Sequence, residues 1–86
     1  MYLHIGQNVV IPETDIIGVF DIDNTTGSQI TRQFLSDAEK AGYLESISDE
    51  LPRSFIVCGT KNDVKVYLSQ LSSQTLLKRI ETMRFD

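Results

Sequence analysis

The sequence predicts the α+β class: a small ββαββα domain with an antiparallel sheet and two helices. Apolar residues alternate with polar ones near the N-terminus and again after residue 53, which is the period of a β-strand. In the middle and at the end of the chain they recur instead at the spacing of an amphipathic helix. At 86 residues the chain is expected to form one domain, residues 1–86, with a small core.

Two strands and a turn are predicted at the N-terminus. Residues 1–5 alternate with period 2, and a turn at 6–8 leads to a second strand over 9–11. Pro12 ends this pairing because proline has no amide hydrogen to donate. The next run, Ile16 to Ile22, is apolar on both faces, which favours a central strand.

The first helix is predicted to begin at Ser28 and to end at Gly42. Ser28 is a good N-cap, because its hydroxyl can accept from the free amides of the first turn. Gly42 adopts a left-handed conformation at low cost, which ends a helix. The apolar positions at helical spacing are Ile30, Phe34, Leu35, Ala38 and Ala41. The following segment, 43–52, is polar and irregular, and no element is predicted there.

The C-terminal part predicts a hairpin and a helix. Residues 53–58 form a strand, several turn residues follow over 59–63, and Val64–Ser69 alternates so that Lys65, Tyr67 and Ser69 lie on a solvated face. Ser72 or Ser73 then caps a helix. Its apolar stripe consists of Leu76, Leu77, Ile80 and Met83.

Composition limits how this domain is stabilised and where it acts. The one cysteine, Cys58, excludes an internal disulfide and a thiolate metal cluster, and we expect it to be a small buried apolar residue. Small cores supply only ~3–5 kcal/mol and often need support from disulfides, metals or oligomerisation. No stretch reaches ~18 consecutive apolar residues, and MYLHIG lacks a basic segment before a long apolar run. We therefore predict a cytoplasmic homo-oligomer without metal, cofactor or membrane association.

The short stretch VFDIDNTT resembles the nucleophile motif of haloacid-dehalogenase-type phosphatases. Asp21 would be the nucleophile, Asp23 the acid/base, and Thr60 with Lys61 would follow a second strand. Such chemistry also needs Mg²⁺, further acidic ligands and parallel strands, and each parallel connection takes a dozen or more residues. Only about 30 residues separate the two strands, so we predict that the protein is not an enzyme. Asp21 and Asp23 then mark the polar end of a strand, before a turn begun by Asp23-Asn24.

Other catalytic groups are scarce. His4, the one histidine, alternates with apolar residues and is expected to be a hydrogen-bonded strand residue. Without a second histidine the many serines have no base to activate them. The five glycines lack the spacing of a phosphate-binding loop.

Charge is unevenly distributed, although the net charge is −4. Residues 1–52 carry two basic groups against nine acidic ones, whereas residues 53–86 carry six basic groups against three. Arg53 follows a proline at the start of a strand, where a guanidinium can reach phosphate or a guanine edge, or can instead pair with Asp49 or Glu50. Lys78 and Arg79 on the last helix also fit an ordinary solvated face. The candidate DNA contacts are Arg53, Lys61, Lys65, Lys78, Arg79 and Arg84.

Five segments together resemble a known family. MYLHIG, DIIGVFD, PRSFIV, VYLS and SSQTLLKR occur in the order found in the RemB branch of the RemA/RemB extracellular-matrix regulators of Gram-positive bacteria. The resemblance covers nearly the whole chain. It implies a cytoplasmic regulator that promotes transcription of biofilm matrix genes, a fold similar to LytTR-type DNA-binding domains, and a hairpin strand for VFDI.

The resemblance also bears on partners and site residues. The RemA branch binds double-stranded promoter DNA as a ring of identical subunits. Three of its contact positions fall near Asp15, Glu50 and Leu51 here, which are not basic, whereas Arg53 matches an arginine. We therefore hypothesise a DNA-binding, homo-oligomeric transcriptional regulator. The alternative is an adaptor that acts on another regulator through protein contacts, without binding DNA.

Overall fold

The computed structural model describes residues 1–22, 28–60 and 63–84, and confirms an α+β fold with two helices. In chain order the elements are β1 (Tyr2–Gly6), β2 (Val9–Pro12), the short 3₁₀ turn η1 (Glu13–Asp15), β3 (Ile16–Asp21), α1 (Ser28–Ala41), β4 (Leu44–Ser46), β5 (Ser54–Gly59), β6 (Val64–Ser69) and α2 (Ser73–Arg84). The order among these residues is therefore βββαβββα. The order ββαββα counts one strand too few before α1, where the three runs predicted one by one are all present, and it lacks β4 after α1.

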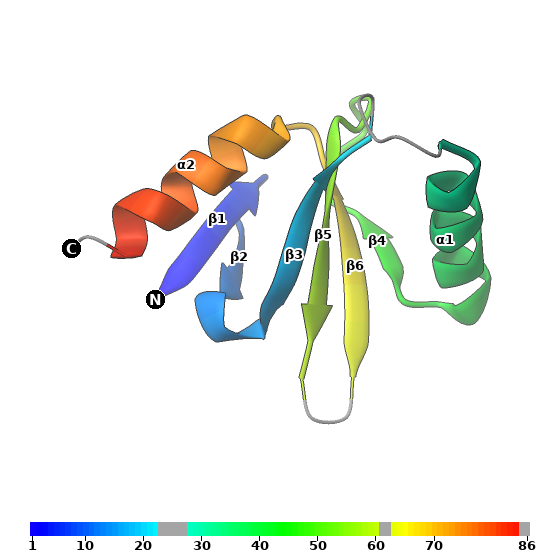
Figure 1. Cartoon of the computed structure of the whole chain (residues 1–86), viewed down its shortest axis with the longest axis horizontal. Helices are drawn as coiled ribbons and strands as arrows, with labels where there is room; N and C mark the ends of the chain where they lie inside the picture. The colour runs from blue at the N-terminus through cyan, green and yellow to red at the C-terminus, as the bar shows by residue number, and fades with distance from the viewer. Residues whose placement is uncertain (23–27, 61–62, 85–86) are drawn as a thin grey trace.

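The strands form two sheets (Figure 1). β1 and β2 make a two-stranded antiparallel sheet, and the other four strands make a second sheet in the order β3-β5-β6-β4. β3 and β6 both pair with β5 in antiparallel orientation, whereas β4 runs parallel to β6. The expected purely antiparallel sheet is therefore wrong. In sequence β5 comes between β4 and β6, but in the sheet β4 and β6 are neighbours. The segment that contains β5 is therefore the long connection that the parallel pair β4–β6 requires.

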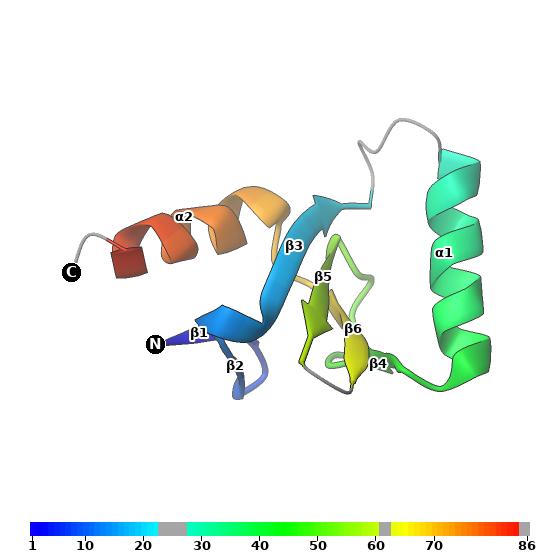
Figure 2. The same cartoon turned by 60° about the horizontal axis from the view of Figure 1, so that its bottom comes forward.

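Both faces of the four-stranded sheet are covered (Figures 1 and 2). The β1–β2 hairpin and α2 cover one face, around a core of Leu3, Ile5, Ile11, Ile56, Cys58 and Leu76. α1 covers the other face, around Ala38, Phe55 and Val66. Neighbouring residues of β5 alternate between the two cores, as the period of a strand requires.

The N-terminal hairpin follows the predicted pattern. Leu3 and Ile5 are buried, while Tyr2 and His4 are exposed. Gln7 and Asn8 have φ angles of 49° and 65°, so the two-residue turn has the left-handed pair typical of a tight hairpin. Pro12 is the last residue of β2, where its missing amide hydrogen disturbs no further pairing.

α1 ends where the sequence predicted. Gly42 has a φ of 87°, and the amides of Gly42 and Tyr43 donate to the carbonyls of Glu39 and Ala38, at 3.1 Å each. This pattern is the Schellman motif that closes many helices. Of the predicted apolar face, Ala38 is buried and Leu35 half-buried. Ile30, which is 77% exposed, does not belong to the core.

β3 lies at the edge of the sheet, so the prediction of a central strand is wrong. β3 is not a hairpin strand either, because α1 and β4 come between it and its partner β5 in the sequence. Its apolar residues divide between environments. Val19 packs against the first core, whereas Ile17 is 67% exposed. The apolar residues on both faces of β3 are therefore not all buried: those on one face pack in the core, and Ile17 on the other is in contact with solvent.

The predicted solvated face of β6 is solvated at Lys65, which is exposed, but is covered toward the other end of the strand. Ser69 is fully buried and Tyr67 is half-buried, because the β1–β2 hairpin lies over this face. The Ser69 hydroxyl donates to the carbonyl of Ile5 at 2.7 Å and accepts from the amide of Leu71 at 3.1 Å. One buried hydroxyl therefore joins β1 to the segment leading into α2.

Ser72 is the N-cap of α2, since its hydroxyl accepts from the amide of Thr75 at 3.2 Å. Leu76 is fully buried and Ile80 half-buried, whereas Leu77 is exposed.

Neither described helix is long and apolar enough to cross a membrane. Several predictions lie outside the described residues or side chains: the turn at Asp23-Asn24, the Ser28 cap, Lys61, Met83 and Arg84.

Ser69→Ala should lower the free energy of unfolding by about 1–3 kcal/mol, because it leaves the Ile5 carbonyl and the Leu71 amide without their shared buried partner. Urea denaturation measures this loss. Ser46→Ala is the control: its hydroxyl bonds the Ser48 carbonyl at an exposed position, and the change should stay within about 0.5 kcal/mol. Equal effects of the two variants would contradict a special role of Ser69.

Candidate nucleic-acid interface

The four predicted basic residues whose side chains the structure describes do not form one patch. Arg53 directly precedes Ser54 at one end of β5, while Lys65 pairs with Cys58 near the other end. Position 58 is five residue steps from position 53 along β5, which corresponds to roughly 16 Å at about 3.3 Å per residue. Lys78 and Arg79 lie on α2. Lys61 and the Arg84 side chain are outside the description, so their relation to this set stays a prediction.

Arg53 combines a fixed backbone with an exposed side chain. Its amide donates to the Ser69 carbonyl at 2.9 Å, and its carbonyl accepts from the Ile22 amide at 3.1 Å. Its side chain is exposed, and no ion pair with Asp49 or Glu50 is found among the described residues. The guanidinium therefore projects from a rigid point at the end of the sheet, with its donors available to a ligand.

Lys65 is already engaged by neighbours. Its ammonium lies 3.3 Å from a carboxylate oxygen of Glu45 on β4 and 5.7 Å from the centre of the Tyr67 ring. The bond to Glu45 is the main reason that the pKa of Lys65 is raised. A phosphate at this position would have to compete with Glu45, so Lys65 is a weaker candidate contact than Arg53.

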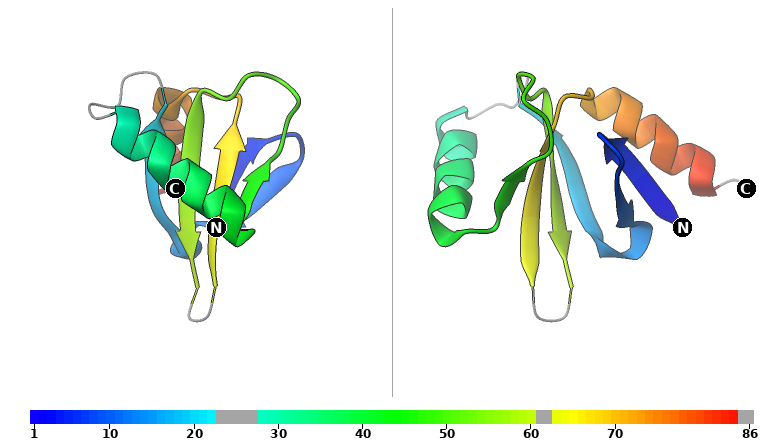
Figure 3. Two further views of the ribbon diagram at one scale, coloured as in Figure 1. Left: turned by 90° about the vertical axis from the view of Figure 1, so that its right-hand side faces the viewer. Right: turned by 180° about the vertical axis from the view of Figure 1, so that it is seen from behind.

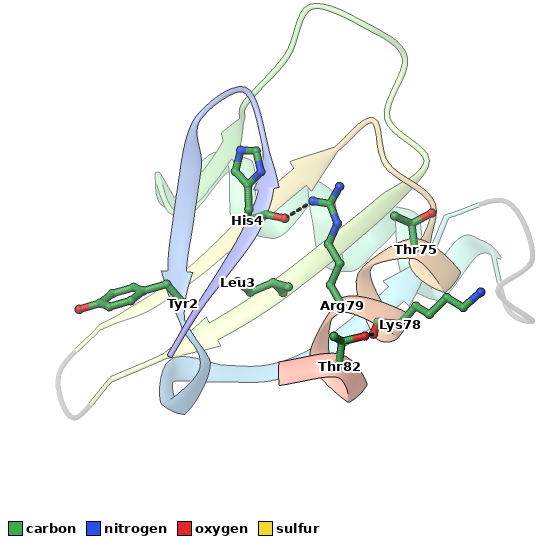
Figure 4. A pocket seen from close by; sticks show the side chains of 7 residues that line it. All are labelled: Tyr2, Leu3, His4, Thr75, Lys78, Arg79 and Thr82. Atoms are coloured by element: carbon green, nitrogen blue, oxygen red, sulfur yellow. Dashed lines mark hydrogen bonds between the residues drawn. The ribbon is translucent and has the colours of Figure 1, made fainter. Parts of the chain in front are cut away.

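A groove between β1 and α2 holds the other two described candidates (Figure 4). Its volume is about 510 Å³, and it is lined by Tyr2, Leu3, His4, Thr75, Lys78, Arg79 and Thr82. Arg79 reaches across the groove and donates to the carbonyl of His4 at 2.6 Å. In Figure 4 the Lys78 side chain points away from Arg79, so the two cations do not converge on one point.

His4 therefore has a hydrogen-bonded role, as predicted, but through its backbone carbonyl. The groove itself was missed by the sequence analysis. The sequence does contain a pattern that corresponds to the groove: Thr75, Arg79 and Thr82 recur at helical spacing on the side of α2 that faces β1. This stripe is polar, so it does not stand out beside an apolar pattern.

A second, smaller cavity of about 210 Å³ lies at the far end of β5, where Cys58 and Asp15 are among the lining residues. Cys58 is buried, as predicted. Burial, and to a lesser degree the negative charge of Asp15, raises the pKa of the Cys58 thiol to about 11. The thiol is thus protonated at neutral pH, which is the unreactive form.

The phosphatase-like stretch has a structural role in its described part. Asp21 ends β3, and one of its carboxylate oxygens accepts from the Ser73 hydroxyl at 3.2 Å, at the start of α2. β3 is antiparallel to its neighbour β5, so Asp21 does not stand at the carboxyl end of a parallel sheet. Asp23 lies outside the described residues. Within the described chain, no group of three or more His, Cys, Asp or Glu side chains could hold a metal ion.

Comparison with known proteins identifies the class. Residues 2–80 match the family model described as RemA-like, extracellular matrix regulatory protein A-like. The chain belongs to this family. It is also 36% identical over 83 residues to extracellular matrix regulatory protein B of Bacillus subtilis (strain 168), covering 96% of this chain and 94% of the relative. The RemB-like assignment made from the sequence is confirmed.

The three positions that the resemblance singled out lie in two places. Asp15 is in η1, directly before β3, whose first residue pairs with Cys58 near the end of β5. Glu50 and Leu51 are in the connection between β4 and β5, close to Arg53 at the start of β5. One chain therefore presents these positions at opposite ends of β5.

Arg79→Ala should lower the free energy of unfolding by about 1 kcal/mol, because it removes a charged hydrogen bond that joins α2 to β1 at a partly exposed position. Lys78→Ala is a matched control, since it removes the same charge from the same helix and should change stability by less than about 0.5 kcal/mol. Thermal and urea unfolding of both variants test this difference, and equal losses would contradict the anchoring role.

Stability should also depend on Cys58 at alkaline pH. Well below pH 9.0 the thiol is protonated in both the folded and the unfolded chain, so it adds no pH dependence there. As the pH rises toward about 11, the unfolded chain ionises first, and the free energy of unfolding should fall. Cys58→Ala should lack this part of the decline. Urea unfolding of both proteins across that range measures it, and parallel curves would contradict it.

Proposed function

We propose that this protein is a non-catalytic regulator of extracellular matrix genes that binds promoter DNA in the cytoplasm as a homo-oligomer. The proposal rests first on membership of the RemA-like family and on similarity to a relative named extracellular matrix regulatory protein B. A LytTR-like mode of DNA recognition belongs to the same proposal. The observation that carries the DNA contact is Arg53, an exposed guanidinium on a backbone held by two hydrogen bonds.

Self-association is supported by the exposed edge of β3. An edge strand offers unpaired amides and carbonyls, and proteins usually cover or charge such edges. Here the edge borders a groove of about 340 Å³ that includes Ile17, Val19, Leu77 and Ile80, and Ile17 is 67% exposed. Burial of such side chains against another subunit would add the stability that a small core lacks.

Repetition explains how an acidic chain would bind DNA. A single Arg53 contributes one contact, and the described basic groups of one chain are dispersed. An oligomer repeats each contact at a fixed spacing, so several weak contacts act together on one DNA molecule. Each phosphate neutralised releases counterions, which makes affinity fall steeply with salt.

The alternative is an adaptor that contacts another regulator without binding DNA. It is favoured by Asp49, Glu50 and Leu51, an acidic and apolar segment at the place where the related branch has basic contacts. Its distinguishing property is the absence of DNA binding at low salt.

Arg53→Ala should weaken binding to matrix-gene promoter DNA at least tenfold, since losing an arginine contact costs ~1–3 kcal/mol per site and every subunit loses it. Fluorescence anisotropy over a series of salt concentrations measures the affinity. Light scattering should show the same oligomer as the wild type, with a nearly unchanged melting temperature.

The matched control is Arg32→Ala, which removes an exposed arginine of α1. It should bind DNA like the wild type. Unchanged affinity of Arg53→Ala would defeat the contact role, and loss of the oligomer would make Arg53 an interface residue. A wild type without DNA affinity at low salt would favour the adaptor.

A further inference from the structure

The buried polar side chains of the described chain gather at one end of the four-stranded sheet. Among the described residues they are Ser54, Ser69 and Ser73, of which the first two are fully buried. We call these three residues the serine cluster. Ser54 follows Arg53 in the chain, begins β5 and pairs with Ser69 on β6. The buried hydroxyls therefore lie next to the residue that is proposed to contact DNA.

The hydroxyls of Ser54 and Ser69 hold the same neighbour. Ser54 donates to the carbonyl of Leu71 at 2.8 Å. Ser69 accepts from the amide of Leu71 at 3.1 Å and donates to the carbonyl of Ile5 at 2.7 Å. A buried hydroxyl is costly unless it is hydrogen-bonded, and both hydroxyls meet this requirement. Leu71 is thus fixed through its amide and through its carbonyl.

The segment that contains Leu71 joins β6 to α2. Figures 1 and 3 show this connection passing over the end of the sheet where β3 ends and β5 begins. Ser73, at the start of α2, adds a further bond, because its hydroxyl donates at 3.2 Å to a carboxylate oxygen of Asp21 at the end of β3. The serine cluster therefore links the beginning of α2 to β1, β3 and β5.

The backbone of Arg53 is positioned by the same residues. Its amide donates to the carbonyl of Ser69 at 2.9 Å, and the hydroxyl of the following residue, Ser54, is held by Leu71. A shift of either serine would therefore move the Cα atom of Arg53. Because the guanidinium is at the end of a long side chain, a small rotation of the backbone displaces it further than it displaces the Cα atom.

Stability alone does not account for hydroxyls at these buried positions. Replacing both partners of a buried hydrogen bond by apolar groups of the same shape can be nearly neutral or even stabilising. What a hydroxyl adds is direction, since a hydrogen bond weakens steeply when its angle is poor. A polar network in which every member is satisfied therefore favours one arrangement of the backbone around it.

We propose that Ser54 and Ser69 are positioning residues for Arg53, which fix its backbone so that the guanidinium is already aimed when DNA binds. Both serines are fully buried, so they act on DNA only through Arg53. A binding group that is ordered in advance loses less entropy on binding. This inference rests on the DNA contact in the proposed function and adds the residues that make that contact effective.

A double-mutant cycle with Arg53→Ala tests the positioning role. Ser54→Ala should weaken binding to promoter DNA about threefold to tenfold, which is the range that ordering of one long side chain is worth. Fluorescence anisotropy measures the affinity at a temperature where every variant is folded. In the Arg53→Ala background the same substitution should have no further effect, because no guanidinium is left to position. Equal losses in both backgrounds would overturn the positioning role. Ser69→Ala is a second, independent variant with the same expected pattern.

Hydrogen exchange measured by NMR gives a readout that does not depend on DNA. In Ser54→Ala and in Ser69→Ala the Arg53 amide should exchange roughly tenfold faster, because the loss of one buried hydrogen bond loosens its attachment to β6. The Val66 amide, which donates to the Tyr43 carbonyl at 2.8 Å, is the internal reference and should change little. Equal acceleration of the two amides would mean a general loss of stability and would overturn the positioning role.

Ala38→Gly is the matched control for lost stability. Ala38 is fully buried in the core between α1 and the sheet, and glycine in a helix is less stable than alanine. This variant should unfold more easily, yet it should bind DNA like the wild type and keep the Arg53 amide protected. Serine variants that bind DNA as Ala38→Gly does would overturn the positioning role and leave the Arg53 contact intact.

The wild type and Arg53→Ala separate this inference from the proposed function. If Arg53→Ala binds DNA as tightly as the wild type, or if the wild type does not bind DNA at low salt, the DNA contact fails and the positioning role fails with it. If Arg53→Ala weakens binding and neither serine variant does, only the positioning role fails.

Discussion

The structure depends on covering both faces of one four-stranded sheet. This requirement comes from β5, which has large apolar side chains on both of its faces. Phe55 and Ile56 are neighbours in sequence and are buried on opposite faces of the sheet. A chain of 86 residues meets the requirement with α1 on one face and with its two ends, β1–β2 and α2, on the other. The Ser69 hydroxyl and Arg79 then fix these end segments to the sheet and to each other.

This division determines where interacting groups can lie. Because both faces are occupied, a ligand can reach only the ends and edges of the sheet and the outer surfaces of the covering layers. Arg53 and the connection between β4 and β5 lie at one end, Asp15 and Cys58 at the other, and the exposed edge of β3 runs between them. The described candidate cations belong to different surfaces, so they form no extended basic surface within one chain.

Local patterns were sufficient for much of the fold. The alternation in residues 1–5 predicted the N-terminal strand, and Gly42 marked the end of α1 because glycine adopts at low cost the left-handed conformation that closes many helices. β4 was missed, since Leu-Glu-Ser is short and polar and becomes a strand only by pairing with β6. β3 was misplaced because exposed apolar residues such as Ile17 look, in sequence, the same as buried ones.

The candidate site was less predictable, for a related reason. Arg53 could be found because proline and a strand start fix its surroundings within the sequence. That Lys65 is held by Glu45, or Arg79 by a carbonyl of β1, depends on contacts across 20 and 75 residues that no local pattern encodes. The covering of Ser69 and Tyr67 likewise became visible only once the hairpin was placed.

The joining of the two ends also has a consequence for the order of folding during synthesis. β1 and β2 are made before the other described elements, yet the partners of Ile5 and His4 are Ser69 and Arg79, 64 and 75 residues later in the chain. An isolated two-stranded hairpin is marginal in water, so β1 and β2 have no lasting structure until their partners in the core, which include β5 and α2, have been made. The apolar side chains of β1 therefore stay accessible to chaperones, and to other nascent chains, for most of translation.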